Sequence, residues 1–234
     1  YNNTSKSIKL LERAKRYGVN NFVFSCTAAV YGDPPKEVAF SIPETQPCRP
    51  INAYGESKLM FETILKRYSE VNPNFKYASL RYFNVAGNDI GNRVQDIHWR
   101  QKGNVVPKIM SRILDGKGEF TVFGVDYDTD DGSCIRDYVH PTDLAKAHLI
   151  CLEQEVVGVY NLGTNRGTSV WEIVKESVSC TNSEINVIHG NKRKGDPPKL
   201  VANPSRFMEK TGWEASYNIN EIVRTAYKAY KKVK

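Results

Sequence analysis

Tyr54 and Lys58 are spaced so that a helix would carry both side chains on one face. They lie four positions apart in the stretch 54–58, which reads Tyr-Gly-Glu-Ser-Lys and opens a long helical pattern. A phenol is a poor base at neutral pH, but a lysine ammonium one helical turn away favours its phenolate form. Such a tyrosine can take a proton from a sugar or alcohol hydroxyl while a hydride leaves the same carbon. Protein side chains offer no hydride acceptor, so this chemistry implies a nicotinamide cofactor.

Thr27 is predicted to bring a hydroxyl group to the same place. The apolar run 20–24 is typical of a buried strand, and Thr27 lies just past its end. Ligands of open α/β sheets bind outside the carboxyl ends of the strands. We therefore expect the strand end and the next helix to hold Thr27, Tyr54 and Lys58 over one ligand. A Tyr-x-x-x-Lys pair alone would be a weak signal, and the strand and the amphipathic helix strengthen it.

Four motifs, in order along the chain, resemble those of the extended short-chain dehydrogenase/reductase family. They read Ser-Cys-Thr-Ala-Ala-Val-Tyr-Gly at 25–32, Tyr-Gly-Glu-Ser-Lys at 54–58, Leu-Arg-Tyr-Phe-Asn at 80–84 and Arg-Asp-Tyr-Val-His at 136–140. The resemblance covers essentially the whole chain and is strongest to the members that invert C4 of a UDP-hexose. It implies NAD that stays bound as the hydride carrier, a UDP-sugar substrate and a homodimer.

The resemblance also implies roles for the residues around the reacting carbon. Tyr54 would take the proton from the sugar 4-hydroxyl, and Lys58 and Thr27 would complete the catalytic group. The hydride would pass to NAD and return to the other face of a transient 4-keto sugar. The residues expected to contact the cofactor are Asn2 or Asn3, Ser25, Tyr54, Lys58 and Phe83.

A larger set is expected to contact the UDP-sugar. The resemblance implies that Arg136 and Arg193 hold the diphosphate, and a guanidinium fork suits bidentate phosphate binding. It also implies that Asp196 binds the ribose and that the segment 121–123 holds the uracil with its backbone and its aromatic ring. The whole expected set is Thr27, Tyr54, Asn84, Asn104, Val105, Thr121, Val122, Phe123, Arg136, Arg193, Asp196 and Leu200.

The expected fold is α/β: the C-terminal part of a doubly wound Rossmann-type NAD domain plus a smaller α/β substrate-binding domain. Residues 1–84 would form the second half of the NAD domain. Residues 85–234 would mainly bind the nucleotide sugar, with about 134–162 returning to the Rossmann sheet. No glycine-rich phosphate loop occurs in the sequence. Because a dinucleotide fold holds the pyrophosphate at such a loop, we expect the glycine-rich first half to lie on a longer chain or a second polypeptide.

Composition restricts the alternatives. The chain has 234 residues, a net charge of +7 and a charged fraction of 25%, and its lysines and arginines are dispersed among acids. That dispersal disfavours a nucleic-acid partner. No apolar run is long enough to cross a membrane, so no membrane partner is expected. Five cysteines without metal or redox spacing suit a reducing compartment, so a cytoplasmic location and no metal site are expected.

Other functions stay open. Dehydratases of the same family need an acid and a base beside the catalytic threonine, whereas Thr27 is followed by Ala28 and Ala29, which favours epimerisation. A UDP-N-acetylglucosamine 4-epimerase or decarboxylase is the nearest alternative. Leu200 aligns with a family position that admits N-acetylated sugars when small and excludes them when bulky, and leucine is intermediate. A non-catalytic cofactor sensor is the alternative from another class, and the retained Tyr-x-x-x-Lys pair argues against it.

Overall fold

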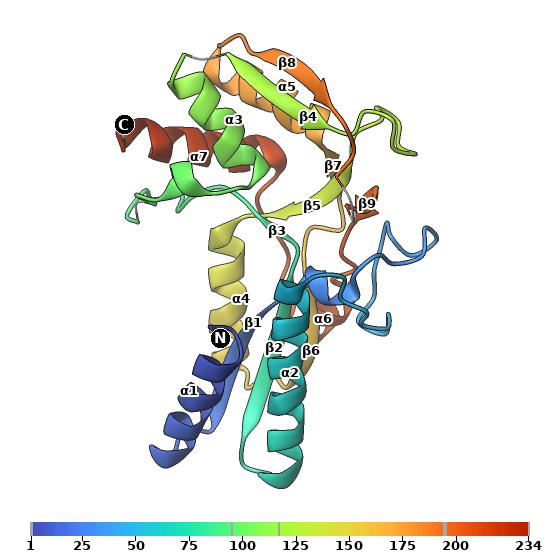
Figure 1. The fold of residues 1–234 in the computed structure, drawn as a ribbon. Coiled ribbons are helices and arrows are strands. Elements are labelled where there is room, and N and C mark those ends of the chain that lie inside the picture. The colour runs from blue at the N-terminus through green and yellow to red at the C-terminus, as the bar shows by residue number, and fades with distance from the viewer. Residues whose placement is uncertain (1, 95, 117, 194–195, 234) are drawn as a thin grey trace.

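A computed structural model describes residues 2–94, 96–116, 118–193 and 196–233 of the chain (Figure 1). One end of the molecule is built on a parallel sheet. Its strands are β1 (Asn21–Thr27), β2 (Lys76–Tyr82) and β6 (Gly158–Leu162), in the order β1-β2-β6. The five middle residues of β2 are buried, as expected for a central strand of a parallel sheet that is covered on both faces.

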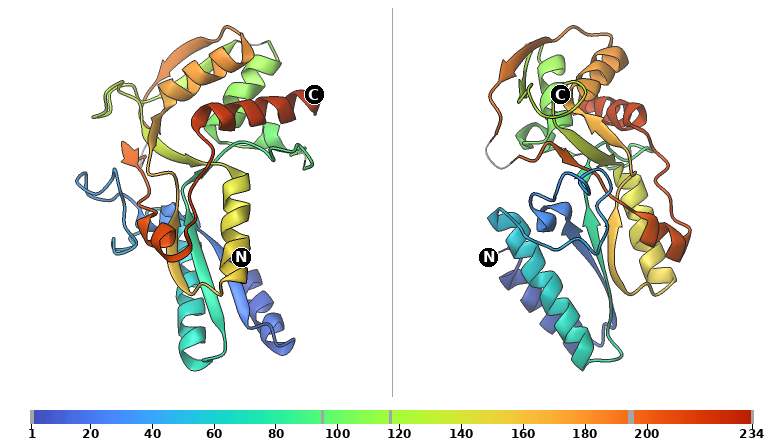
Figure 2. Two further views of the ribbon diagram at one scale, coloured as in Figure 1. Left: turned by 180° about the vertical axis from the view of Figure 1, so that it is seen from behind. Right: turned by 90° about the vertical axis from the view of Figure 1, so that its right-hand side faces the viewer.

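Helices cover both faces of this sheet. The helices α1 (Ser5–Arg16) and α2 (Ala53–Val71) lie on one face, and α4 (Pro141–Glu153) lies on the other (Figure 2). The short helix α6 (Ser205–Thr211) packs beside β6. Between the sheet and α2, Phe24 packs edge-on against Phe61 with ring centroids 4.9 Å apart. This packing fixes α2 over the strand whose end carries Thr27.

The other end of the molecule is organised around β5 (Ile135–Val139). β5 pairs in parallel with β3 (Asn84–Val85) and β9 (Lys199–Leu200) and antiparallel with β7 (Gly167–Ser169). A separate parallel pair joins β4 (Glu119–Phe123) to β8 (Asn186–Gly190). β5 and β6 therefore lie in different sheets, although the sequence between them is short. Only β6 pairs with the sheet of β1 and β2.

Three helices pack together at this end: α3 (Val105–Leu114), α5 (Val170–Thr181) and α7 (Ile219–Lys232). Their apolar faces share one core with β4, which includes Ile109, Ile173 and Ile222. The 3-10 turn at Trp99–Gln101 joins this core through a stacked pair, Trp99 and Tyr230, whose ring centroids lie 4.2 Å apart. The loop before α3 is thereby held against α7.

The observed elements confirm the predicted α/β class with parallel sheets. α4 begins at Pro141, and its N-cap is His140, whose Nδ1 accepts a hydrogen bond from the backbone N–H of Thr142 at 3.1 Å. Ser169 caps α5 in a reciprocal capping box with Glu172. Within the described ranges, no helix has the length and apolar character needed to cross a membrane.

Candidate active site

Lys58 lies against the carboxyl end of β1. Its Nζ donates a hydrogen bond to the carbonyl oxygen of Ser25 at 2.9 Å and stands 5.9 Å from the centre of the Tyr54 ring. The Tyr54 side chain is half exposed, with 50% of its surface accessible. The two side chains that were predicted to share a helix face therefore do so, at the strand end where a ligand of an α/β sheet would bind.

Gly55 lets α2 approach this strand end. A Cβ atom at Gly55 would lie 2.5 Å from the carbonyl oxygen of Ala29, which is far inside van der Waals contact. Ala29 belongs to the 3-10 turn that follows Thr27, and its N–H donates to Thr27 Oγ1 at 3.2 Å. A glycine between Tyr54 and the rest of the helix is what allows the first turn of α2 to rest on the turn after Thr27.

A buried ion pair fixes α2 one turn beyond Lys58. Glu62 accepts two hydrogen bonds from Arg81 of β2, Nε–Oε2 at 3.1 Å and Nη2–Oε1 at 2.5 Å. Arg81 Nη1 also donates to the Tyr31 hydroxyl at 2.9 Å. Tyr54, Lys58 and Glu62 follow one another at helical spacing, so the pair orients the face that carries the first two. Burial raises the pKa of Tyr31 to about 12, so this hydroxyl stays protonated and can donate to Asn161.

Burial changes the acid–base behaviour of Lys58. The side chain is half buried between α2 and β1, with Nζ 5.1 Å from the centre of the Phe24 ring. Desolvation disfavours its charged form and lowers the pKa of Lys58 from its ordinary value. The ammonium is thus held in place but loses its proton at a lower pH than an exposed lysine would.

The residues expected at the cofactor have different surroundings. Asn3 Nδ2 donates to Ser57 Oγ at 3.1 Å, whereas Asn2 is exposed and its amide makes no hydrogen bond within the described ranges. The Ser25 hydroxyl accepts from the Tyr82 hydroxyl at 2.7 Å. Phe83 is buried in the core between β1 and α2. Of the two asparagines, Asn2 is the one with a free amide.

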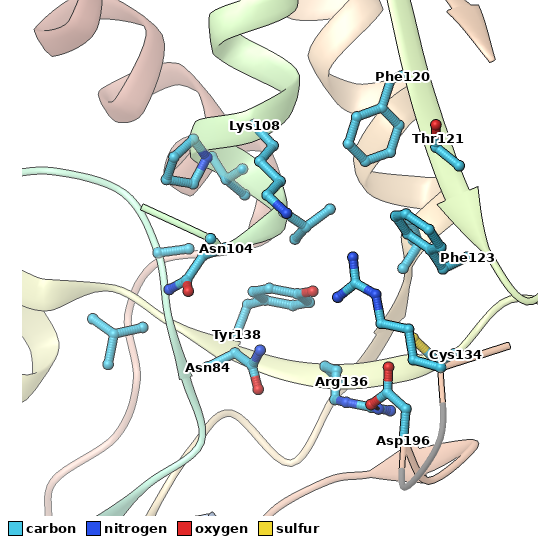
Figure 3. A pocket seen from close by; sticks show the side chains of 18 residues that line it. Asn84, Asn104, Lys108, Phe120, Thr121, Phe123, Cys134, Arg136, Tyr138 and Asp196 are labelled. Atoms are coloured by element: carbon cyan, nitrogen blue, oxygen red, sulfur yellow. Dashed lines mark hydrogen bonds and ion pairs between the residues drawn. The ribbon is translucent and has the colours of Figure 1, made fainter. Parts of the chain in front are cut away.

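A cavity of about 240 Å³ lies at the other end of the molecule, between the N-terminus of α3, strand β4 and strand β5 (Figure 3). The register of β1 and β2 aligns Thr27 with Tyr82, two residues before Asn84. Asn84 lines the cavity, so this residue connects the strand end to the cavity. Neither Thr27, Tyr54 nor Lys58 is part of its lining among the residues the structure describes.

The cavity brings together most of the side chains that were predicted to bind the UDP-sugar. Those that line it are Asn84, Asn104, Val105, Thr121, Phe123, Arg136, Arg193 and Asp196. Arg136 and Asp196 form an ion pair, and Arg136 is almost completely buried. The Arg193 guanidinium stacks 4.2 Å from the centre of the Phe123 ring. Residues more than a hundred positions apart in the sequence thus line one cavity.

Four predicted substrate contacts lie outside this lining: Thr27 and Tyr54, which lie at the strand end, and Val122 and Leu200. The Val122 side chain is completely buried in the core behind β4, because alternate residues of a strand face opposite sides. Leu200 lies in β9, where it pairs with Arg136, and its side chain packs toward the core near β1. Only the backbone of Val122 is available to a ligand here.

The lining also contains residues that were not predicted, among them Gly103, Lys108, Phe120, Cys134 and Tyr138. Alternation could have suggested Tyr138, which is two residues from Arg136 on β5. Lys108 sits one turn into α3, next to Asn104, but a lone charge on a helix gives no signal of its own. Among the described residues, no cluster of histidine, cysteine and acidic side chains could hold a metal ion.

Parallel strands with helices on both faces, and a Tyr/Lys helix face at the strand ends, define an α/β protein of the doubly wound class. Residues 1–163 match the NAD dependent epimerase/dehydratase family, and the chain belongs to that family.

Similar proteins cover nearly all of the chain. It is 37% identical over 235 residues to the UDP-glucose 4-epimerase of Lactobacillus helveticus, covering 98% of this chain and 70% of that protein. The crystal structure of UDP-glucose 4-epimerase from Brucella ovis in complex with NAD is 36% identical, with a TM-score of 0.90, over 98% of this chain and 71% of that one. The UDP-glucose 4-epimerase from Bifidobacterium longum in complex with NAD⁺ and UDP is 32% identical, with a TM-score of 0.84, over 95% and 67%.

Proposed function

We propose that the protein interconverts UDP-galactose and UDP-glucose by NAD-dependent epimerisation at C4, as a UDP-glucose 4-epimerase. The observation that carries this proposal is the placement of Tyr54 and Lys58 on one helix face at the end of β1, with Asn84 linking that strand end to the cavity. The named relatives, which are UDP-glucose 4-epimerases, support the same reaction.

The chain's own groups account for the proton chemistry. Tyr54 is half exposed, so it can reach the sugar 4-hydroxyl and take its proton. Lys58 places a positive charge one turn away, which favours the phenolate. The hydroxyl of Thr27, which already accepts from Ala29, can donate its own proton to the substrate oxygen. The same tyrosine returns the proton when the transient 4-keto sugar is reduced on its other face.

The donor groups around Lys58 fit the nicotinamide end of NAD. An ammonium has three donor hydrogens. Lys58 donates one to the carbonyl oxygen of Ser25, so two are available for ribose hydroxyls. The free amide of Asn2 is proposed as a further cofactor contact, with Ser25 and Phe83 beside it. NAD, when bound, accepts the hydride from C4 and gives it back, so it is not consumed.

The cavity is proposed to hold the UDP part of the substrate. Arg136 and Arg193 supply guanidinium groups for the diphosphate, and Asp196 can accept a hydrogen bond from the ribose. Phe123 is partly exposed at the cavity, and an aromatic face suits stacking on a base. Asn104 and Val105 lie at the start of α3. The first backbone N–H groups of a helix have no partner within it, so they can donate to the substrate.

The two parts of the chain are proposed to have different roles. Residues 1–84 would carry the cofactor and the catalytic group, and residues 85–234 would mainly bind the UDP-sugar.

We propose a homodimer formed through α1 and α2, where Leu10 and Met60 expose 58% and 48% of their surfaces, since exposed apolar side chains are typical of interfaces. A cytoplasmic location is proposed with it, because all five cysteines are free thiols.

The direct test follows UDP-galactose by NMR in the presence of the protein and a small amount of NAD. Conversion to UDP-glucose is expected, and Tyr54→Phe should slow it by about 10²- to 10⁴-fold. Tyr68→Phe, on the same helix but packed against Phe75, is the matched control and should convert normally. NAD binding without conversion would instead identify a cofactor sensor.

A further inference from the structure

Lys108 is a cation in the cavity that has no role in the site described so far. It lies in the first turn of α3, and its backbone N–H donates to the carbonyl oxygen of Asn104, the N-cap residue, at 3.2 Å. Figure 3 shows its side chain reaching from α3 into the cavity, with the amine turned toward Tyr138. Lys108 is exposed to solvent on the side of the cavity, so a ligand in the cavity can reach its ammonium.

The other charged groups of the cavity already have partners. Arg136 is paired with Asp196, and Arg193 stacks on the Phe123 ring. Lys108 makes no ion pair or side-chain hydrogen bond with any residue that the structure describes. Its charge is therefore available to a ligand without breaking any contact of the protein.

The charges of the cavity match a diphosphate only when Lys108 is included. Among the residues that the structure describes, the charged lining residues are three cations, Lys108, Arg136 and Arg193, against one carboxylate, Asp196. Each phosphate of a sugar nucleotide carries a negative charge, so two positive charges in excess neutralise the pair. Without Lys108 the excess falls to one, and one phosphate would be desolvated without a counter-charge, which is costly.

The start of α3 reinforces the same position. The Asn104 side chain makes no capping hydrogen bond, and Pro107 carries no N–H. The N–H groups of Val105 and Val106 are thus free, and the positive end of the helix dipole points the same way as the ammonium. Val105 and Lys108 both line the cavity, so a phosphate there would meet both.

We propose that Lys108 binds the diphosphate of the UDP-sugar and supplies the second net positive charge that this pocket needs. The inference rests on the proposed function, since it concerns how that substrate is held. If the proposal is correct, removing the charge of Lys108 weakens the binding of ligands that carry phosphates and not the binding of ligands without them.

The test compares UDP with uridine by isothermal titration calorimetry. Lys108→Met should weaken UDP binding about tenfold, the cost of a lost charge-assisted contact, and leave uridine binding unchanged. The matched control is Arg112→Met, which removes the same charge from the same helix one turn further on, outside the cavity lining. It should bind both ligands like the wild type. Lys108→Arg should retain most of the UDP affinity because it keeps the charge.

Two outcomes would overturn the inference while leaving the proposed function intact. In the first, Lys108→Met binds UDP as tightly as Arg112→Met does. Any loss of UDP affinity would then follow from the lower net charge of both variants and not from a contact of Lys108. In the second, Lys108→Met weakens uridine and UDP binding by the same factor, which would place Lys108 at the base or the ribose. Failure of the wild type to bind UDP would reject the proposed function and the role of Lys108 together.

Discussion

The proton chemistry depends on one charge at one position. Lys58 is held between the Ser25 carbonyl and the Phe24 ring, where it can act on Tyr54. Lys58→Met should lower kcat about 100-fold, because the phenolate loses the charge that favours it. Lys66→Met, on the same helix but exposed, should have normal kcat. Steady-state kinetics with UDP-galactose measure both, and equal rates for the two variants would contradict the role of Lys58.

The burial of Lys58 also has a consequence for the pH dependence of the reaction. Since desolvation lowers the pKa of Lys58, its activating charge is present below that lowered value and is lost as the pH rises through it. We expect kcat to fall on the alkaline side. An arginine stays protonated at any such pH, so in Lys58→Arg the residual activity should persist to higher pH. A pH profile with the same alkaline fall in both proteins would assign it to another group.

Leu200 is where the choice between plain and N-acetylated sugars can be tested. It pairs through β9 with Arg136, which lines the cavity. A larger side chain leaves less room for an N-acetyl group, and a smaller one leaves more. The ratio of kcat/KM for UDP-N-acetylglucosamine to that for UDP-glucose should fall in Leu200→Tyr and rise in Leu200→Ser. An unchanged ratio in both variants would show that this position is not the gate.

At the scale of elements, the contact between α2 and the turn after β1 sets the active-site geometry. Gly55→Ala would place a Cβ 2.5 Å from the Ala29 carbonyl oxygen, so the helix must shift. We expect a loss of about 1–3 kcal/mol in the free energy of unfolding and a lower kcat with little change in UDP affinity. Gly103→Ala meets nothing within 4 Å and should leave stability unchanged. Urea denaturation measures both, and equal stabilities would refute the contact.

The same scale shows what the sequence could predict and what it could not. The long helical pattern that opens at Tyr54 corresponds to α2, and the apolar run 20–24 corresponds to β1. Strands of two or three residues, such as β3 and β9, carry too few positions for a periodic pattern. Their existence depends on pairing with β5, which is a tertiary property.

Within the site, residues that belong to a sequence motif were predicted, whereas residues that reach the site only through the tertiary fold were missed. Arg136 stands in one of the four motifs, and the structure brings it to the cavity. Lys108 could not be told from a solvated lysine, because its side chain is exposed and only the position of α3 brings it to the cavity. Val122 shows the opposite error, since the alternation of β4 that buries it could have been read from its neighbours.

At the scale of the whole molecule, His140 connects the two ends. It directly follows β5 and caps α4, and its Nε2 lies 3.0 Å from Thr225 Oγ1 on α7. Because Nδ1 accepts the N–H of Thr142, the ring is neutral with its proton on Nε2. Burial lowers the pKa of His140 below its ordinary value, and this effect outweighs the charges of Asp143 and Glu221.

This neutral histidine predicts how the stability of the molecule depends on pH. Its contribution is present above the unfolded value, about 6.5, and is lost as the pH falls through the lower folded value, because the unfolded chain then binds a proton that the folded chain does not. His140→Asn keeps a capping side chain. The free energy of unfolding of this variant should fall less than that of the wild type between about pH 7.5 and about pH 5.0, which lie roughly 1 unit above and roughly 1.5 units below the unfolded value. Urea denaturation at both values provides the measurement, and equal losses would exclude His140 as the source.

The cavity is assembled from segments far apart in the chain, because β4 reaches it only by pairing with β8, residues 119–123 with 186–190. Such pairings form late, since the loop between them must first be closed. A chain that has collapsed without them has no place for the nucleotide. Immobilised UDP would therefore retain the correctly folded molecules of a preparation and let misfolded ones pass, which makes affinity for the nucleotide a measure of folding quality as well as of function.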